Sequence, residues 1–190
     1  MKKFFYLLLI SISLVLVGCD NTLKGKQYVE ISVKDYGKIK LELDADVAPI
    51  TVNNFIKLTK EKFYDGLTFH RIMNGFMIQG GDPNGNGTGG SSEKIIGEFK
   101  NNGYENNISH VRGVISMARA PINMNSASSQ FFIVHKDSTF LDGNYAAFGK
   151  VIEGMAVVDK IALVEPENSE TGLVAKEKQP VIESIRVVSK

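Results

Sequence analysis

Short apolar runs recur between clusters of glycine and asparagine from Leu67 onward, and this spacing limits the possible folds more than any other feature. The runs cover residues 69–73, 76–79, 114–117, 131–134 and 146–151. Such runs, separated by turn residues, are typical of strands in an antiparallel sandwich or barrel. Parallel sheets instead alternate strand patterns with helical patterns. We therefore predict a mainly β domain.

The flanking segments fit the same picture. Apolar residues alternate with polar ones over 29–33 and 39–43, on either side of Asp35-Tyr36-Gly37, which predicts a β-hairpin with one buried face. Helical spacing follows Pro49 as far as Phe63, and a shorter helix is predicted over 155–163. A polar loop over 165–179 leads to a last strand over 181–188. No repeat or second domain boundary is visible.

The first nineteen residues have a different character. Met1-Lys2-Lys3 precedes a charge-free apolar run from Phe4 to Val17, which is shorter than the roughly 20 residues of a membrane-spanning helix. A basic start, a short apolar stretch and a small residue before the junction are typical of a secretory signal. Residues 16–19, Leu-Val-Gly-Cys, resemble the bacterial lipobox, where cleavage precedes a cysteine that is then lipidated. The alternative is a buried N-terminal helix with an incidental cysteine.

These observations divide the chain into a lipoprotein signal peptide (1–18), a lipidated Cys19 with a short tether (19–27) and one folded domain (28–190). The lipid on Cys19 implies an extracytoplasmic protein held on the bacterial cell membrane. Removing Lys2 and Lys3 with the signal leaves 20 basic residues of the 22, against 21 acidic ones. A near-neutral charge argues against a nucleic-acid partner. With one cysteine and three separated histidines, we expect neither a disulfide framework nor a metal site.

Two short motifs carry little weight. Residues 85–90, Gly-Asn-Gly-Thr-Gly-Gly, match G-x-G-x-x-G, but no helix follows to receive a pyrophosphate. We interpret this segment as a loop that needs positive φ angles. Ser91-Ser92-Glu93-Lys94 matches S-x-x-K without the other elements of penicillin-binding enzymes.

His70 and His135 lie in strand-like runs, and we predict hydrogen-bonded structural roles for both.

Two longer segments are far more specific. Residues 69–82 read FHRIMNGFMIQGGD, and residues 113–120 read GVISMARA before continuing through NSASSQFFI at 125–133. A third stretch, FLDGNYAAFGKV, occupies residues 140–151. Together these segments closely resemble the cyclophilin family of peptidyl-prolyl cis–trans isomerases, from about Tyr28 to Val188. The resemblance implies a closed eight-stranded antiparallel β-barrel capped by two α-helices.

The resemblance also assigns roles to individual residues. It places the catalytic arginine at Arg71, with Phe76 and Gln79 beside it. The remaining matches are substrate-binding positions: Met77, Gly87, Ala118, Arg119, Ala120, Gln130, Phe132, Phe140, Leu141 and Tyr145. The substrates implied are proline-containing polypeptides, and the activity implied is acceleration of X-Pro bond rotation, which assists the folding of exported proteins. No cofactor is implied, and we expect a monomer.

The residue types suit that chemistry. An arginine stays protonated and can donate a hydrogen bond to the prolyl nitrogen when the peptide bond twists, while an apolar pocket holds the ring. On position alone, Arg71 could instead form a surface salt bridge, and Phe76, Met77 and Phe132 could belong to the barrel core. The family's frequent tryptophan and histidine are replaced by Phe140 and Tyr145, and a common asparagine by Arg119. The alternative function is a non-catalytic module or chaperone that binds proline peptides at the cell surface.

Overall fold

The computed structural model describes residues 22–190, so the predicted signal peptide and Cys19 lie outside the described residues. Within these residues, eight strands form a single antiparallel sheet in the order β3-β4-β6-β5-β7-β2-β1-β8. Their bounds are β1 Lys26–Val33, β2 Gly37–Asp44, β3 Thr68–Met73, β4 Met77–Asp82, β5 Val114–Met117, β6 Phe131–Val134, β7 Ala147–Glu153 and β8 Ile182–Val188. The predicted mainly β domain is confirmed. β1 begins at Lys26, within the segment that we assigned to the tether.

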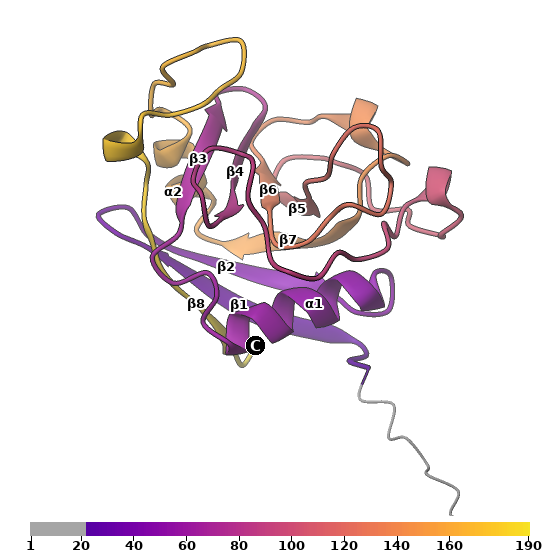
Figure 1. Ribbon diagram of the computed structural model, residues 1–190. Helices are drawn as coiled ribbons and strands as arrows, with labels where there is room; N and C mark the ends of the chain where they lie inside the picture. Colours follow the sequence, from indigo (N-terminus) through magenta and orange to yellow (C-terminus); the bar gives the residue numbers. More distant parts are fainter. Residues whose placement is uncertain (1–21) are drawn as a thin grey trace, which may run out of the picture.

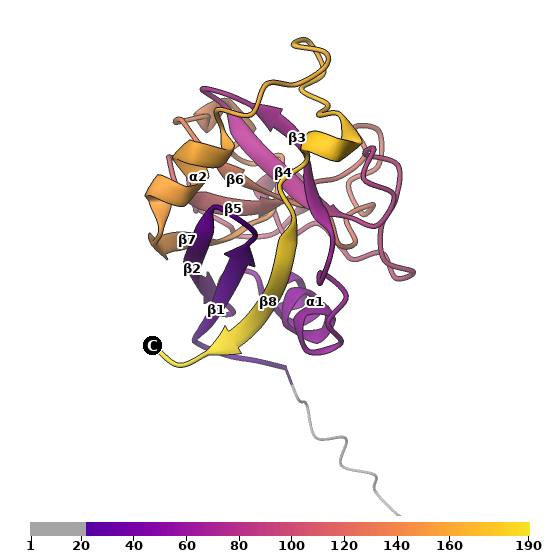
Figure 2. The same ribbon diagram turned by 90° about the vertical axis from the view of Figure 1, so that its left-hand side faces the viewer.

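The sheet curls into a half-barrel, and the predicted closed barrel is wrong (Figures 1 and 2). β3 meets the segment that begins β8 at one isolated bridge, Thr68 with Val181, flanked by hydrogen bonds from Phe69 N to the Pro180 carbonyl (2.9 Å) and from Ile182 N to the Leu67 carbonyl (2.7 Å). Pro180 has no N–H to donate and cannot extend a ladder. Beyond Phe69, the edge of β3 is instead bordered by the loop residues around Leu173.

In the described part of the chain, two helices pack on the sheet, as the sequence predicted. α1 (Pro49–Lys60) contacts β8 and β2, and α2 (Met155–Ile161) contacts β2. Figure 2 shows α1 beside β8 and α2 near β7, and buried residues of both helices belong to the same main core. The apolar side of α1, which includes Val52 and Phe55, is fully buried in the main core. Residues 22–190 also contain three short 3₁₀ turns: η1 Lys100–Asn102, η2 Thr139–Leu141 and η3 Lys176–Lys178.

Apolar side chains form two separate clusters, one on each face of the sheet. Successive residues of a strand point to opposite faces. On β6, Phe131 therefore belongs to the main core inside the half-barrel, whereas Phe132 belongs to a smaller outer cluster. On β4, Ile78 and Met77 divide in the same way. Met77 and Phe132 are thus not part of the main core, and the outer cluster provides an apolar surface for a site.

Candidate active site

The outer cluster lines a pocket of about 320 Å³, which we call the apolar pocket. Met77, Phe132 and Leu141 are buried in its floor, and Phe76 and Tyr145 are half-buried. The structure brings ten of the thirteen predicted catalytic and substrate-binding residues together here: Arg71, Phe76, Met77, Gln79, Gly87, Ala118, Arg119, Phe132, Leu141 and Tyr145. Pro121 also lines the pocket, and the sequence analysis did not single it out.

Phe140 lies at the rim rather than in the lining. Its ring centroid is 5.6 Å from that of Phe76, with the planes tilted by 32°. The Phe140 side chain is 71% exposed, an unusual degree for a phenylalanine. An apolar segment entering the pocket past Phe76 could therefore cover this ring.

The guanidinium of Arg71 is fixed at the edge of the apolar pocket by neighbours on several sides. Nε donates to the Thr171 carbonyl at 2.7 Å, and one terminal nitrogen donates to Gln79 Oε1 at 3.1 Å. The other terminal nitrogen lies 3.1 Å from the Met73 sulfur. Burial lowers the pKa of Arg71, but an arginine still carries its charge at neutral pH. The structure thus presents a cationic donor to an apolar pocket.

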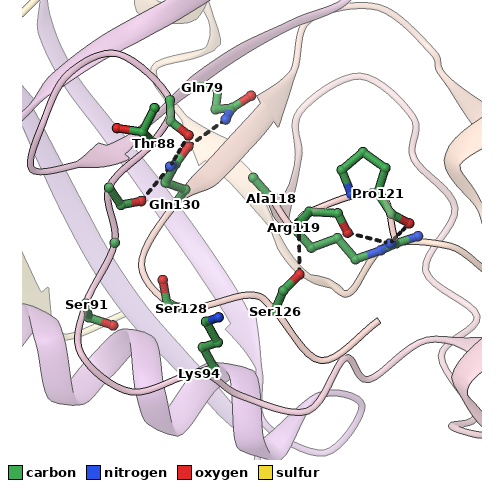
Figure 3. Close-up of a pocket in the computed structure, with 14 residues that line it drawn as sticks. Gln79, Thr88, Ser91, Lys94, Ala118, Arg119, Pro121, Ser126, Ser128 and Gln130 are labelled. Carbon is green, nitrogen blue, oxygen red and sulfur yellow. Dashed lines mark hydrogen bonds between the residues drawn. The ribbon is translucent and has the colours of Figure 1, made fainter. Parts of the chain in front are cut away.

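Gln79 continues this hydrogen-bond chain toward the glycine-rich loop. Its Nε2 donates to Gln130 Oε1 at 2.8 Å (Figure 3). Gln130 Nε2 in turn donates to the carbonyls of Gly87 (3.1 Å) and Gly89 (2.7 Å). Gly87 has a φ of +90°, as predicted for this loop. These hydrogen bonds link Arg71 to the glycine-rich loop, which forms one wall of the site.

A second hollow of about 480 Å³, which we call the polar hollow, is drawn in Figure 3. It adjoins the apolar pocket. The two share Gln79, Gly87, Ala118, Arg119 and Pro121. The remaining predicted residues, Ala120 and Gln130, line the polar hollow. Its other lining residues were missed as site residues: Thr88, Gly89, Gly90, Ser91, Lys94, Ser126 and Ser128. We call the two adjoining hollows together the groove.

Arg119 stabilises the part of the lining that the two hollows share. Its Nε donates to the Asn144 carbonyl at 2.8 Å, and a terminal nitrogen donates to the carbonyls of Ala120 and Pro121, each at 3.0 Å. The guanidinium carbon also lies 4.9 Å from the centroid of the Tyr145 ring. These contacts hold the 118–121 segment against the pocket, a structural task that the sequence did not indicate.

His110 is the main site residue that sequence reasoning missed. Its ring is buried beneath Phe132, with Nδ1 2.8 Å from Asp142 Oδ1 and Nε2 3.0 Å from Ser116 Oγ. Burial lowers the pKa of His110, and the hydrogen bond with Asp142 opposes this shift. Ser116 is fully buried, so the three residues cannot act as a nucleophilic triad on a substrate. They form a polar support under the pocket floor.

The other two histidines have different outcomes. His135 Nδ1 accepts from Gly75 N at 3.0 Å and its Nε2 lies 3.1 Å from Asp159 Oδ1, which confirms its predicted structural role. His70 is fully buried, as expected of a structural histidine, but neither ring nitrogen has a hydrogen-bond partner in residues 22–190, so the predicted hydrogen bonding is wrong. Within the same residues, no group of three or more His, Cys, Asp or Glu side chains could hold a metal ion.

Known proteins match both the sequence and the fold. A family model described as "Cyclophilin type peptidyl-prolyl cis-trans isomerase/CLD" matches residues 28–187. Peptidyl-prolyl cis-trans isomerase A of Dickeya dadantii is 40% identical over 159 residues, covering 81% of each chain. Peptidyl-prolyl cis-trans isomerase B of Bacillus subtilis is 46% identical over 123 residues, which are 65% of this chain and 82% of the relative.

A solved structure shows the same fold. It is a cyclophilin-type peptidyl-prolyl cis-trans isomerase of Cryptosporidium parvum, crystallised in the presence of the dipeptide Ala-Pro. It is 32% identical, has a TM-score of 0.76 and covers 86% of this chain and 100% of its own. The family match extends over nearly the whole described domain, and the apolar pocket lies within it. The chain belongs to the cyclophilin-type peptidyl-prolyl cis–trans isomerase family.

Proposed function

We propose that this isomerase catalyses cis–trans isomerisation of X-Pro bonds in proteins exported across the bacterial membrane, with Arg71 as the catalytic group. The observation that supports this role is the oriented guanidinium of Arg71 beside an apolar pocket of about 320 Å³. A pyrrolidine ring fits the chemistry of such a pocket, because the floor of Met77, Phe132 and Leu141 offers apolar contacts on several sides.

The chemistry follows from the electronic structure of the peptide bond. Resonance gives the C–N bond double-bond character and a rotation barrier of about 18–20 kcal/mol. In the twisted transition state this resonance is lost, and the prolyl nitrogen regains a lone pair that can accept a hydrogen bond. Arg71 is the donor to that nitrogen. The hydrogen bond exists only in the transition state, so it raises the rate rather than merely tightening substrate binding.

The other site residues bind the substrate or orient Arg71. Phe76 and Gln79 stand next to Arg71, where Phe76 encloses the ring and Gln79 orients the guanidinium. Phe140 at the rim and Tyr145 in the pocket lining contact the entering peptide. The main chain of the substrate lies along Gly87, Ala118, Arg119, Ala120 and Gln130. Among residues 22–190, no backbone hydrogen bond uses the main-chain N–H or carbonyl of Arg119, so both can pair with a peptide.

We also propose that the mature protein is a monomer anchored to the membrane by lipid on Cys19. Residues 1–18 have the pattern of a signal peptide. Leu23 N donates a hydrogen bond to Asn53 Oδ1 on α1, so the folded domain begins within a few residues of Cys19. Within residues 22–190, no helix is long and apolar enough to cross a membrane. Mass spectrometry of the mature N-terminus should show an acylated Cys19, and Cys19→Ser should release the protein from the membrane fraction. An unmodified Met1 contradicts this proposal.

Exchange spectroscopy on an X-Pro peptide tests the catalytic role. Arg71→Ala should lower the catalysed exchange rate about 100-fold or more, the usual effect of removing one transition-state donor. Peptide affinity should change by less than about threefold, because the apolar pocket remains. Arg186→Ala is the matched control, since the Arg186 guanidinium pairs with Asp65. An Arg71→Ala enzyme with full activity refutes the role of Arg71. If the wild-type protein binds the peptide without accelerating exchange, the alternative function, a non-catalytic binding module, is correct.

A further inference from the structure

The segment that follows α2 takes the place of a strand along part of β3. Arg71 forms an isolated antiparallel bridge with Leu173. Ile72 N donates to the Gly172 carbonyl at 2.7 Å, and Val174 N donates to the His70 carbonyl at 3.0 Å. Figures 1 and 2 show this part of the chain close to β3. We call residues 167–174 the edge loop.

The edge loop also reaches the side chain of Arg71. Thr171 presents its carbonyl oxygen to Nε at 2.7 Å, a shorter bond than the 3.1 Å bond between the guanidinium and Gln79 Oε1. A guanidinium is planar and rigid, so contacts at Nε and at one terminal nitrogen fix its orientation in the plane. The edge loop thus contributes one of the two oxygen acceptors that hold Arg71.

Asn168 builds the turn that places this carbonyl. Its Oδ1 accepts from the N–H groups of Glu170 (2.8 Å) and Thr171 (3.0 Å). Its main-chain carbonyl accepts from Gly172 N at 2.8 Å. Gly172 has a φ of +77°, and a Cβ there would lie 2.5 Å from Met73 Cγ. The turn therefore depends on an asparagine side chain at one end and on a glycine at the other.

We propose that the edge loop is a positioning element of the isomerase and that Asn168 is its positioning residue, acting through the Thr171 carbonyl on Arg71. This inference rests on the proposed role of Arg71. A donor that is oriented before the peptide bond twists needs no reorientation in the transition state, and small misplacements of catalytic groups have large effects on rate. The bond uses a main-chain oxygen, so the identity of the side chain at position 171 is secondary.

Asn168→Ala is the direct test, because it removes both Oδ1 hydrogen bonds. It should lower kcat about tenfold, with the affinity for a proline peptide unchanged within about twofold. Asn168→Asp keeps an acceptor oxygen at the same place and should retain most of the activity. Ser169→Ala is the matched control, an equally small change on the same exposed loop. Gly172→Ala attacks the turn independently, through strain and the contact with Met73, and should lower kcat in the same direction.

An NMR signal separates positioning from a general structural effect. The Arg71 Nε–H should exchange slowly in the wild type, and Arg71→Ala assigns its signal by removing it. In Asn168→Ala this signal should shift and exchange faster. An unchanged signal or an unchanged kcat overturns the inference, as does a loss of activity matched by an equal loss of peptide affinity. Full activity in Arg71→Ala instead refutes the role of Arg71 itself, so the two failures are distinct.

Discussion

The imidazole of His110 lies nearly parallel to the ring of Phe132, with centroids 6.0 Å apart and an 18° angle between the planes. Tyr145 meets both rings edge-on, at 6.5 Å from His110 and 5.9 Å from Phe132. A titratable ring therefore supports the floor of the apolar pocket. Protonation of His110 would place a charge in a buried layer, where desolvation opposes it.

This arrangement predicts a loss of stability in mild acid. Burial lowers the pKa of both His110 and His70 in the folded state. As pH falls below about 6.5, the unfolded chain binds protons that the folded chain does not yet bind, so the free energy of unfolding decreases. Each histidine contributes at most about 1.4 kcal/mol per pH unit. Urea unfolding at pH 7.5, 6.5 and 5.5 measures the slope, which His110→Gln should reduce. A midpoint that is constant over this range contradicts the prediction.

The neighbouring phenylalanines of β6 should separate stability from binding. Phe131 packs edge-on against Phe55 and Tyr64 in the main core, whereas Phe132 floors the apolar pocket. We expect Phe131→Leu to lower the free energy of unfolding by about 1–3 kcal/mol with kcat/KM unchanged. Phe132→Leu should lower affinity for a proline peptide about tenfold, with a smaller stability loss. Denaturant titration and peptide titration test the pair, and equal effects of the two substitutions refute the division.

The architecture was largely predictable because periodicity records which face of a strand is buried. The alternation around Phe131 and Phe132 predicted opposite faces, and the strand and helix limits agree within a few residues. Closure of the barrel was not predictable in this way. It depends on whether two edge strands continue past Thr68 and Val181, and Pro180 together with the loop around Leu173 decides that locally. Neither feature leaves a periodic signal.

The sequence predicted those parts of the site that depend on the identity of a side chain. Arg71, Phe132 and most of the pocket lining follow from residue types in long ordered motifs. The support under the floor does not, because Asp142 lies 32 residues from His110 and no spacing rule joins them. The contact from Thr171 is harder still to foresee, since its carbonyl oxygen would be present with any residue at that position.

Gln130 should be needed as a donor, not merely as a polar filler. Its Nε2 donates to the Gly87 and Gly89 carbonyls, while its Oε1 accepts from Gln79. Gln130→Glu has the same shape but lacks the two N–H donors, so both carbonyls lose a partner and the glycine-rich loop loosens. We expect kcat/KM to fall about tenfold and amide exchange at Gly89 to rise. Gln27→Glu, an equivalent change on β1 away from the groove, should leave both unchanged.

The last prediction concerns how α1 is held at its first turn. Ala48 precedes the helix and provides no side-chain cap. Glu98, which is far along the chain and only 1% exposed, caps the helix instead. Its carboxylate accepts hydrogen bonds from Ile50 N (3.0 Å), Thr51 N (2.8 Å) and Thr51 Oγ1 (2.7 Å). A carboxylate at this end of a helix also interacts favourably with the helix dipole.

We therefore expect Glu98→Ala to lower the free energy of unfolding by about 3 kcal/mol, because it leaves buried donors unpaired. Glu93→Ala is the matched control. Its carboxylate pairs with Lys57 at 2.9 Å, but the side chain is 68% exposed, and such pairs are worth about 1 kcal/mol or less. Equal losses in urea unfolding contradict the prediction. Asn54 on α1 donates to the Ser128 carbonyl at 2.6 Å, and Ser128 lines the polar hollow, so Glu98→Ala should also weaken binding of peptides that extend into this hollow.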